Sequence, residues 1–127
     1  LLCSPGILGS SNEGRVLSST SPLVFDGLGR VDLPPGCYLV TFNEVVNIPK
    51  NIMALAMPRS SLLRCGVSIH NAVWDSGYSG RSQALMVVYN PQGFRLHKNA
   101  RIVQLVFFLL SHDVAQGYRG MFQGENI

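Results

Sequence analysis

The sequence predicts an all-β domain, and two observations indicate this fold class. Short apolar segments alternate with clusters of turn-forming residues along most of the 127-residue chain, as in sandwiches and barrels built from short strands. No segment keeps the apolar period of a helix over about ten residues. No internal repeat is visible. A chain of this length corresponds to one domain with its own hydrophobic core.

The strands and turns can be placed in chain order. The expected strands are PLVF (22–25), CYLVTF (37–42), VVNI (45–48), IMALAM (52–57), QALMVVY (83–89) and RIVQLVFFLL (101–110). Turns are expected at DGLG, LPPG, IPKN, DSGYSG, NPQG and HKN, because Gly, Pro, Asn and Asp favour turn conformations. The predicted organisation is a poorly defined arm (1–20), a β domain (21–116) and a flexible C-terminal segment (117–127).

One short helix is expected near residues 60–65, within PRSSLLRCG. Ser60 or Ser61 can cap its N-terminus, and the glycine after LLRC suits the left-handed conformation that ends many helices. Unpaired N–H groups at a helix N-terminus favour phosphate. With Arg59 and Arg64 on either side, the segment is either a capped turn with surface arginines or a phosphate-binding site.

The composition limits the kinds of partner. The chain is 46% hydrophobic and only 13% charged, which is typical of a domain that covers part of its surface in an oligomer. Its longest apolar run (102–110) is too short to cross a bilayer, so no membrane partner is expected. The net charge of +3 comes from scattered arginines and lysines, which favours an anionic small molecule over a nucleic acid. Three cysteines without short spacings indicate a reducing, intracellular compartment.

Asp75 is the only acidic residue between Glu44 and Asp113, and it begins the turn DSGYSG. Its carboxylate could bond backbone N–H groups of the turn, or it could act as a general base at the lip of a pocket. Tyr78 is either a half-buried strand aromatic or a ring that faces a sugar. Gln104 either faces solvent or reaches a ligand. From the residues alone, these alternatives stay open.

Four segments, in this order, resemble the motifs of the dUTPase and dCTP deaminase superfamily. PRSSLLRCG is similar to the RSSLAR motif, VWDSGYSG to VIDxDYxG, RIVQLVF to RIAQLVF, and YRGMFQG to the YxGxYQG ending of archaeal-type members. The resemblance extends over about residues 33–124. It implies a dUTPase-like distorted jelly roll or β-barrel (a β-clip), and a homotrimer whose active sites are shared between subunits.

The resemblance also implies a role for each motif residue. Asp75 corresponds to the general base that activates the attacking water, and Tyr78 to the ring that packs on the deoxyribose. The phosphate-binding residues would be Arg59, Ser60, Ser61, Arg64 and Gln104. The pyrimidine would face His70, Asn71 and Ala72. The C-terminal lid would include Tyr118, Phe122 and Gln123. Mg²⁺ would be held mainly by substrate phosphates and water, without direct protein ligands.

The segment after DSGYSG separates the activities within the family. A deaminase needs a glutamate there to shuttle protons, and RSQALMVVYNP contains no acidic residue. The sequence therefore predicts a cytoplasmic dUTP diphosphatase, which uses Mg²⁺ and water attack on the α-phosphate to form dUMP and pyrophosphate. The family's first motif, with its Asp-Leu pair, is not recognisable at residues 12–18. This departure keeps open the alternative of a regulatory relative that binds dUTP or dTTP without hydrolysis.

Overall fold

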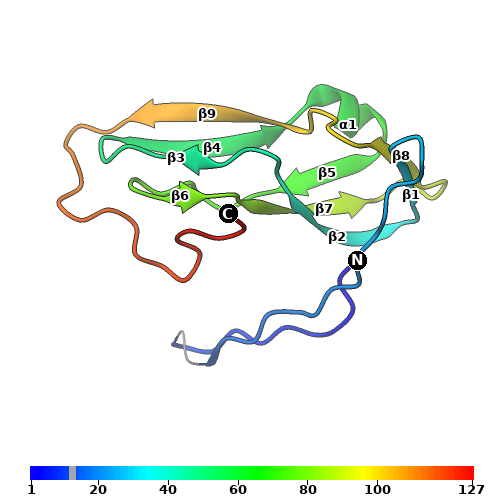
Figure 1. Ribbon diagram of the computed structural model, residues 1–127, viewed down its shortest axis with the longest axis horizontal. Coiled ribbons are helices and arrows are strands. Elements are labelled where there is room, and N and C mark those ends of the chain that lie inside the picture. The colour runs from blue at the N-terminus through cyan, green and yellow to red at the C-terminus, as the bar shows by residue number, and fades with distance from the viewer. Residues whose placement is uncertain (12–13) are drawn as a thin grey trace.

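A computed structural model describes residues 1–11 and 14–127 and consists mainly of β-strands (Figure 1). In chain order the strands are β1 (Arg30–Leu33), β2 (Gly36–Thr41), β3 (Val46–Asn47), β4 (Ile52–Pro58), β5 (Val67–His70), β6 (Ser79–Gly80), β7 (Gln83–Val88), β8 (Phe94–His97) and β9 (Val103–Leu109). The helix α1 (Ser60–Arg64) follows β4 in the chain. The predicted all-β class with one short helix is confirmed. In the described part of the chain, no helix is long and apolar enough to span a membrane.

The strands form small antiparallel sheets. β2, β7 and β5 make a three-stranded sheet, while β1 pairs with β8, β3 with β6 and β4 with β9. In Figure 1, β4 and β9 run side by side along the top of the molecule, and β5 and β7 lie below them. The space between these layers holds the hydrophobic core.

The first part of the core is built around the central strand β7. Its side chains alternate between half-buried and buried, because successive strand residues point to opposite faces of a sheet. Met86 is completely buried, and α1 contributes Leu62 to the same cluster. The buried residues of this cluster are Leu33, Tyr38, Leu62, Val67, Ile69, Ala84, Met86, Val88 and Ile102.

The second part of the core lies against β4 and includes the aromatic rings closest to Asp75 in the sequence. Its buried members are Ile48, Ala54, Ala56, Trp74 and Tyr78. Trp74 forms a β-bridge with Ala54, whose small side chain has no exposed surface. The Phe42 ring lies 6.0 Å from the Trp74 ring, measured between centroids. Burial of these large rings fixes the chain on both sides of Asp75.

One strand prediction is wrong, and four strands were not predicted. Residues 22–25 (PLVF) are exposed and form no strand. Proline has no N–H for a ladder, and none of the described strands pairs with this segment. The missed strands are β1, β5, β6 and β8. β1 and β8 lack an apolar run because they carry a charged pair: Asp32 lies opposite Arg95, with 2.6 Å between Oδ1 and Nε. This hydrogen bond with Arg95 is the main cause that lowers the pKa of Asp32.

The helix α1 confirms the predicted position but not the predicted cap. The N-cap residue is Arg59, which has an extended backbone and makes no side-chain capping bond. Ser60 and Ser61 are already helical, so their hydroxyl groups do not cap the helix as expected. At the other end, Gly66 has a φ of 72°. This is the left-handed conformation expected of the glycine after LLRC.

The two ends of the chain have different structures. Most of residues 1–20 form a hairpin-like arm that extends away from the strands in Figure 1, with bridges between Ile7 and Val16 and between Leu2 and Thr20. Part of the segment in which the first family motif was sought, residues 12 and 13, lies outside the described residues. The C-terminal residues curl back beneath β6. The boundaries of the predicted arm, domain and C-terminal segment remain predictions.

Candidate active site

The free edge of β4 positions Asp75. The Trp74 N–H donates to the Ala54 carbonyl at 2.9 Å, and the Ala54 N–H donates to the Trp74 carbonyl at 3.0 Å. Trp74 is buried, whereas Asp75 is exposed. Neighbouring residues of an extended segment point in opposite directions. Burial of the indole therefore turns the carboxylate of Asp75 outward, where a substrate can reach it.

The structure contains the predicted turn after Asp75, but backbone groups close it. The Tyr78 N–H donates to the Asp75 carbonyl at 3.0 Å, and the Gly77 N–H donates to the Ile48 carbonyl at 2.9 Å. Gly77 has a φ of 83°, which side chains other than glycine rarely adopt. Among the described residues, none donates a hydrogen bond to the Asp75 carboxylate. Both of its oxygens are thus available to a water or a ligand.

A groove of about 350 Å³ contains Asp75. β4 contributes Met53 to its wall, and the C-terminal part of the chain contributes Gln116, Gly117 and Tyr118. The remaining lining residues are Val73, Ser76, Leu110 and Val114. The carboxylate therefore lies among mainly apolar and neutral groups, between the turn and the C-terminal segment.

Tyr78 is a core residue with a hydrogen-bonded hydroxyl group. Its ring is 5% exposed and meets the Tyr118 ring edge-on, with 5.8 Å between centroids. The hydroxyl donates to Glu125 Oε1 at 2.8 Å and accepts from Ser82 Oγ at 2.8 Å. Burial raises the pKa of Tyr78 to about 12; the Ser82 hydrogen bond lowers it, and the Glu125 carboxylate adds to the increase. Tyr78 is therefore neutral at physiological pH.

The C-terminal segment is bound along residues 76–81 of its own chain. Gln123 spans the turn, because its Oε1 accepts from the Ser79 N–H at 2.8 Å and its Nε2 donates to the Gly77 carbonyl at 2.9 Å. The Tyr118 N–H donates to the Ser76 carbonyl at 2.8 Å. Tyr118 and Gln123 thus lie beside the Asp75 turn. Phe122 is half-buried on the same segment.

The expected phosphate-binding residues lie elsewhere in the protomer. Arg59, Ser60, Ser61 and Arg64 are all exposed at or within α1. Arg64 Nη1 donates to the Ser60 carbonyl at 3.1 Å. Gln104 lies opposite Met57 in the β4–β9 ladder and is exposed. None of these side chains lines the Asp75 groove.

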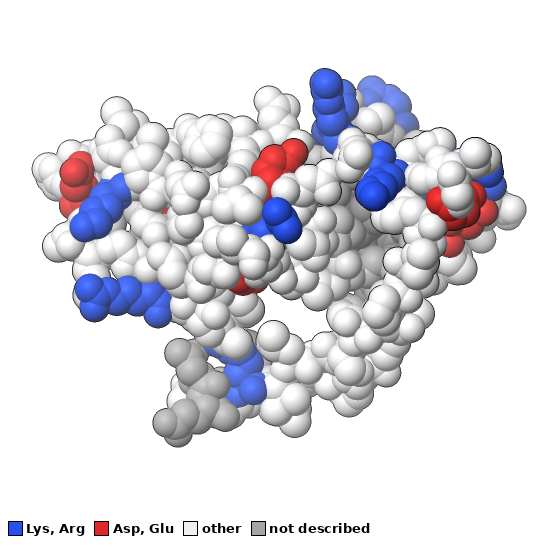
Figure 2. Space-filling view, in the orientation of Figure 1, with Lys and Arg blue, Asp and Glu red and all other residues white. Residues whose placement is uncertain are grey.

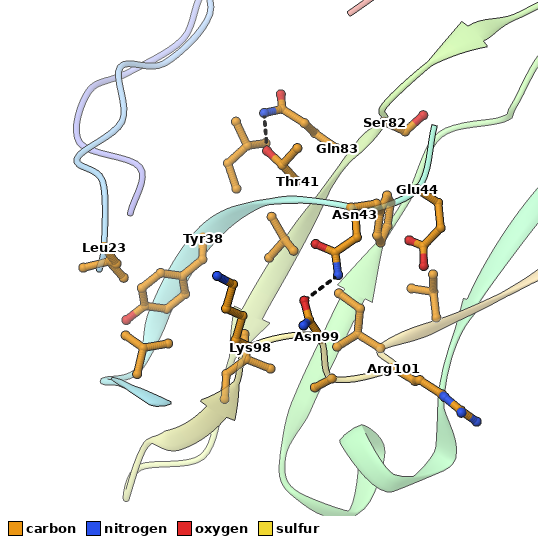
Figure 3. Close-up of a pocket in the computed structure, with 18 of the residues that line it drawn as sticks. Leu23, Tyr38, Thr41, Asn43, Glu44, Ser82, Gln83, Lys98, Asn99 and Arg101 are labelled. Atoms are coloured by element: carbon orange, nitrogen blue, oxygen red, sulfur yellow. Dashed lines mark hydrogen bonds between the residues drawn. The ribbon is translucent and has the colours of Figure 1, made fainter. Parts of the chain in front are cut away.

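A second, larger cavity of about 840 Å³ lies beside Arg59 and Gln104. Figure 3 shows Tyr38 and Leu23 on one side of it, and Asn43, Lys98, Asn99 and Arg101 on another. A hydrogen bond of 3.0 Å joins Asn43 Nδ2 to Asn99 Oδ1 at its edge. Trp74 lines this cavity. Trp74 and Asp75 therefore face different cavities, and one protomer does not bring Asp75 together with the phosphate-binding candidates.

The three candidates for pyrimidine binding precede Asp75 in the chain. His70 ends β5 and is exposed, as is Ala72. Asn71 Nδ2 donates to the Ala56 carbonyl at 3.4 Å, and its buried Oδ1 has no partner among the described residues. None of the three lines either cavity described above.

Sequence reasoning missed Glu125, Ser82 and Ser76. Glu125 and Ser82 hold the Tyr78 hydroxyl, and Ser76 Oγ donates to the Ile52 carbonyl at 2.5 Å. Ser76 was visible only as a turn residue, and Glu125 only as the single acid of the C-terminal segment. The partners of Ser76 and Glu125 lie far away in the sequence, so no local pattern reveals these two contacts. Ser82 lies only four residues from Tyr78, but nothing in its sequence context marks it as a partner of the hydroxyl group.

Charge is sparse around the site. On the face shown in Figure 2, Lys and Arg side chains are scattered among uncharged residues. Within residues 1–11 and 14–127, no group of three or more His, Cys, Asp or Glu side chains could hold a metal ion. A divalent ion at Asp75 would therefore need most of its ligands from a substrate and water.

Comparisons with known proteins agree on one family. The family model described as dCTP deaminase-like matches residues 10–110. A probable deoxyuridine 5'-triphosphate nucleotidohydrolase of Methanosarcina mazei is 52% identical over 121 residues, covering 95% of this chain and 71% of the relative. One of Methanococcoides burtonii is 51% identical over 124 residues, covering 98% and 73%. The deoxyuridine 5'-triphosphate nucleotidohydrolase of Methanocaldococcus jannaschii is 38% identical over 121 residues, covering 94% and 76%.

A solved structure of the EIAV dUTPase has a similar fold. It superposes with a TM-score of 0.57 over 72% of this chain and 78% of that chain, at 17% sequence identity. This likeness supports the predicted dUTPase-like β fold.

Proposed function

The chain belongs to the dCTP deaminase-like family, and on this premise we propose that it hydrolyses dUTP to dUMP and pyrophosphate. The relatives at 51–52% identity carry the name of this activity. The observation that carries the proposal is the exposed Asp75 carboxylate, which lies at the lip of a groove on a turn anchored to β4. A general base needs this combination of access and fixed position.

Asp75 acts as the general base in this reaction. Its carboxylate accepts a proton from a water molecule while the water oxygen attacks the α-phosphorus. The bond between the α-phosphorus and the oxygen that bridges to the β-phosphate breaks, and pyrophosphate leaves with that electron pair. The support is that no described residue donates to the carboxylate, so it can orient a water without first breaking an internal hydrogen bond.

The phosphate clamp comes from a second copy of the chain in a homotrimer. Arg59, Ser60, Ser61, Arg64 and Gln104 form this clamp. Two observations support it: Asp75 and Arg59 line different cavities of one protomer, and one face of the β4–β9 sheet is apolar and exposed. The exposed apolar residues on this face are Leu55, Met57, Val106 and Phe108. Contact between copies would cover the face and complete the site.

The remaining binding residues surround the nucleoside. Tyr78 packs on the deoxyribose, while the pyrimidine meets backbone groups of the segment that contains His70, Asn71 and Ala72. Tyr118, Phe122 and Gln123 belong to the lid. Because Tyr118 covers the Tyr78 ring in this conformation, the lid must move aside before a sugar can stack there.

The residues of the groove are compatible with a Mg²⁺ ion that is bound mainly through the phosphates of the substrate. Mg²⁺ commonly keeps several waters and uses one or two carboxylates together with substrate phosphates. Asp75 is the carboxylate of the groove. The bound ion would neutralise charge on the phosphates, while Arg59 and Arg64 bind and orient them.

Two alternatives are separated by the products they release. A deaminase is disfavoured because β7, the strand after the Asp75 turn, carries no acidic residue. A regulatory relative would bind dUTP or dTTP without hydrolysis. One observation supports this second candidate: the C-terminal segment packs on Tyr78 and so closes the proposed sugar site of a single chain.

A cytoplasmic location is part of the proposal. Cys3, Cys37 and Cys65 are all free and exposed. Exposed thiols persist in a reducing compartment.

Pyrophosphate release from dUTP tests the proposed function. The assay is run with Mg²⁺ and with a chelator, and with dCTP and UTP as competing substrates. Mg²⁺-dependent release from dUTP but not from UTP supports hydrolysis with a sugar gate at Tyr78. Binding of dUTP without pyrophosphate release would replace the proposal with the regulatory alternative, and ammonia release from dCTP would replace it with deamination.

A further inference from the structure

We propose that Ser76 is a positioning residue that holds Asp75 in its catalytic place; this inference rests on the proposed function. Apart from aromatic residues, Ser76 is the only buried residue with a polar side chain in the described part of the chain. Its hydroxyl donates to the Ile52 carbonyl at 2.5 Å. Ser76 directly follows Asp75, so this bond fixes the backbone on one side of the carboxylate.

The hydrogen bonding along the edges of β4 explains why a side chain is needed to bind the Ile52 carbonyl. One edge of β4 pairs with β9 along the whole strand, whereas the Trp74–Ala54 bridge is the only backbone pairing that the described residues make at the other edge. Strand carbonyls two residues apart face the same edge. Two more carbonyls of β4 therefore face the segment that contains Asp75, and side chains take the place of a regular ladder there.

The two side-chain bonds that flank the bridge are unequal. Before Trp74, the Asn71 amide reaches the Ala56 carbonyl only at 3.4 Å, and its Oδ1 is left without a partner among the described residues. After Trp74, Ser76 makes the 2.5 Å bond to Ile52. A long bond is weak and a short, buried one is strong. The firm anchor is thus on the Asp75 side of the bridge.

Ser76 also connects Asp75 to the lid. Its carbonyl accepts the Tyr118 N–H at 2.8 Å. The side chain of Ser76 is therefore bound to β4 while its backbone is bound to the C-terminal segment. Asp75 has no side-chain hydrogen bond from a described residue that could hold it independently, so its position depends on these neighbouring contacts.

Loss of the Ser76 hydroxyl should impair catalysis more than binding. Without it, the Ile52 carbonyl loses its partner and the turn can shift away from β4. A displacement of about 1 Å at a reacting group can cost on the order of 100-fold in rate. The nucleotide phosphates and sugar contact other residues, so substrate affinity depends less on Ser76.

The test compares Ser76→Ala and Ser76→Thr with wild type. Ser4→Ala is the matched control, because it also removes a hydrogen-bonded serine hydroxyl, but in the N-terminal arm. We expect kcat for dUTP to fall about 10- to 100-fold in Ser76→Ala, with KM changed less than about threefold. Ser76→Thr, which keeps a hydroxyl group, should recover part of kcat, and Ser4→Ala should match wild type.

A second readout does not depend on activity. Trp74 is the only tryptophan of the chain and is buried beside Asp75. If Ser76 anchors the segment, acrylamide should quench Trp74 fluorescence more readily in Ser76→Ala than in Ser4→Ala, at a temperature where both are folded.

Each outcome decides between the two ideas. Unchanged kcat and unchanged quenching in folded Ser76→Ala would overturn the positioning role. The positioning role would also be overturned if the loss of kcat in Ser76→Ala equalled the fraction of unfolded protein and Ser76→Thr did not recover it. If wild type itself releases no pyrophosphate, the proposed function fails. Trp74 quenching then still shows whether Ser76 anchors the turn. If Ser76→Ala does not fold, Ser76→Thr is compared with wild type. Retention of part of kcat with unchanged quenching then agrees with the anchor, whereas a loss of about 100-fold in kcat in folded Ser76→Thr contradicts it.

Discussion

The Tyr78 hydroxyl donates a hydrogen bond to Glu125 Oε1 at 2.8 Å, which joins the turn after Asp75 to the C-terminal segment. The same hydroxyl accepts from Ser82 Oγ at 2.8 Å. A buried phenol with both a donor and an acceptor is fully satisfied. The contact fixes the C-terminal segment beside the Tyr78 ring, which the proposed function assigns to the deoxyribose.

Tyr78 should titrate at a higher pH than an ordinary tyrosine. Burial, reinforced by Glu125, raises its pKa to about 12 from the ordinary value of 10.0. A raised pKa in the folded state means that the neutral phenol stabilises the fold. This contribution is complete below the unfolded pKa and is lost as pH rises through the folded pKa. The tyrosinate absorbance of wild type minus that of Tyr78→Phe measures the shift, and a step near pH 10 would contradict it.

Gly77→Ala should destabilise the fold and displace the lid. Gly77 has a φ of 83°, and an added Cβ would lie 2.6 Å from Gly117 Cα. The left-handed conformation alone costs about 1–2 kcal/mol for other residues. Gly27→Ala is the matched control, since its Cβ would meet no atom within 4 Å. Urea unfolding measures both variants, and equal midpoints would show that the turn tolerates a side chain.

Mixed oligomers should show whether sites are shared between copies. Asp75→Asn and Arg59→Ala should each be nearly inactive alone. If base and clamp come from different subunits, co-expression should restore about a quarter of wild-type activity by random assembly. Co-expression of Arg59→Ala with Ser60→Ala is the control. Both changes lie in the proposed clamp, so this mixture should restore no activity. Equal activity of the two mixtures would show that each protomer builds its own site.

Much of the fold could be predicted because several of its strands are recognisable as apolar segments in the sequence. β4, β7 and β9 are mainly apolar, and all three appear where the sequence places them. β1 and β8 could not be predicted in this way, because each needs the other: Asp32 and Arg95 become strand residues only when they pair across the sheet. The segment at residues 22–25 has the apolar character of a strand but pairs with none of the described strands.

The site was predictable only in part, for the same physical reason. Asp75 stands out as a lone acid in a turn, and the motif resemblance gives Asp75 and Tyr78 their roles. The contacts of Ser76 with Ile52 and of Tyr78 with Glu125 join residues far apart in the sequence. Serine and glutamate are common in turns and chain ends, so their importance becomes visible only in the folded chain.

Replacement of Asp75 tests the central claim most directly. Asp75→Asn keeps the size of the side chain but removes the carboxylate that accepts the proton from water. With dUTP and Mg²⁺, kcat should fall on the order of 10²- to 10⁴-fold, while a non-hydrolysable dUTP analogue should bind as tightly as to wild type. Turnover of Asp75→Asn within a few-fold of wild type would contradict the account, because the base would then lie elsewhere.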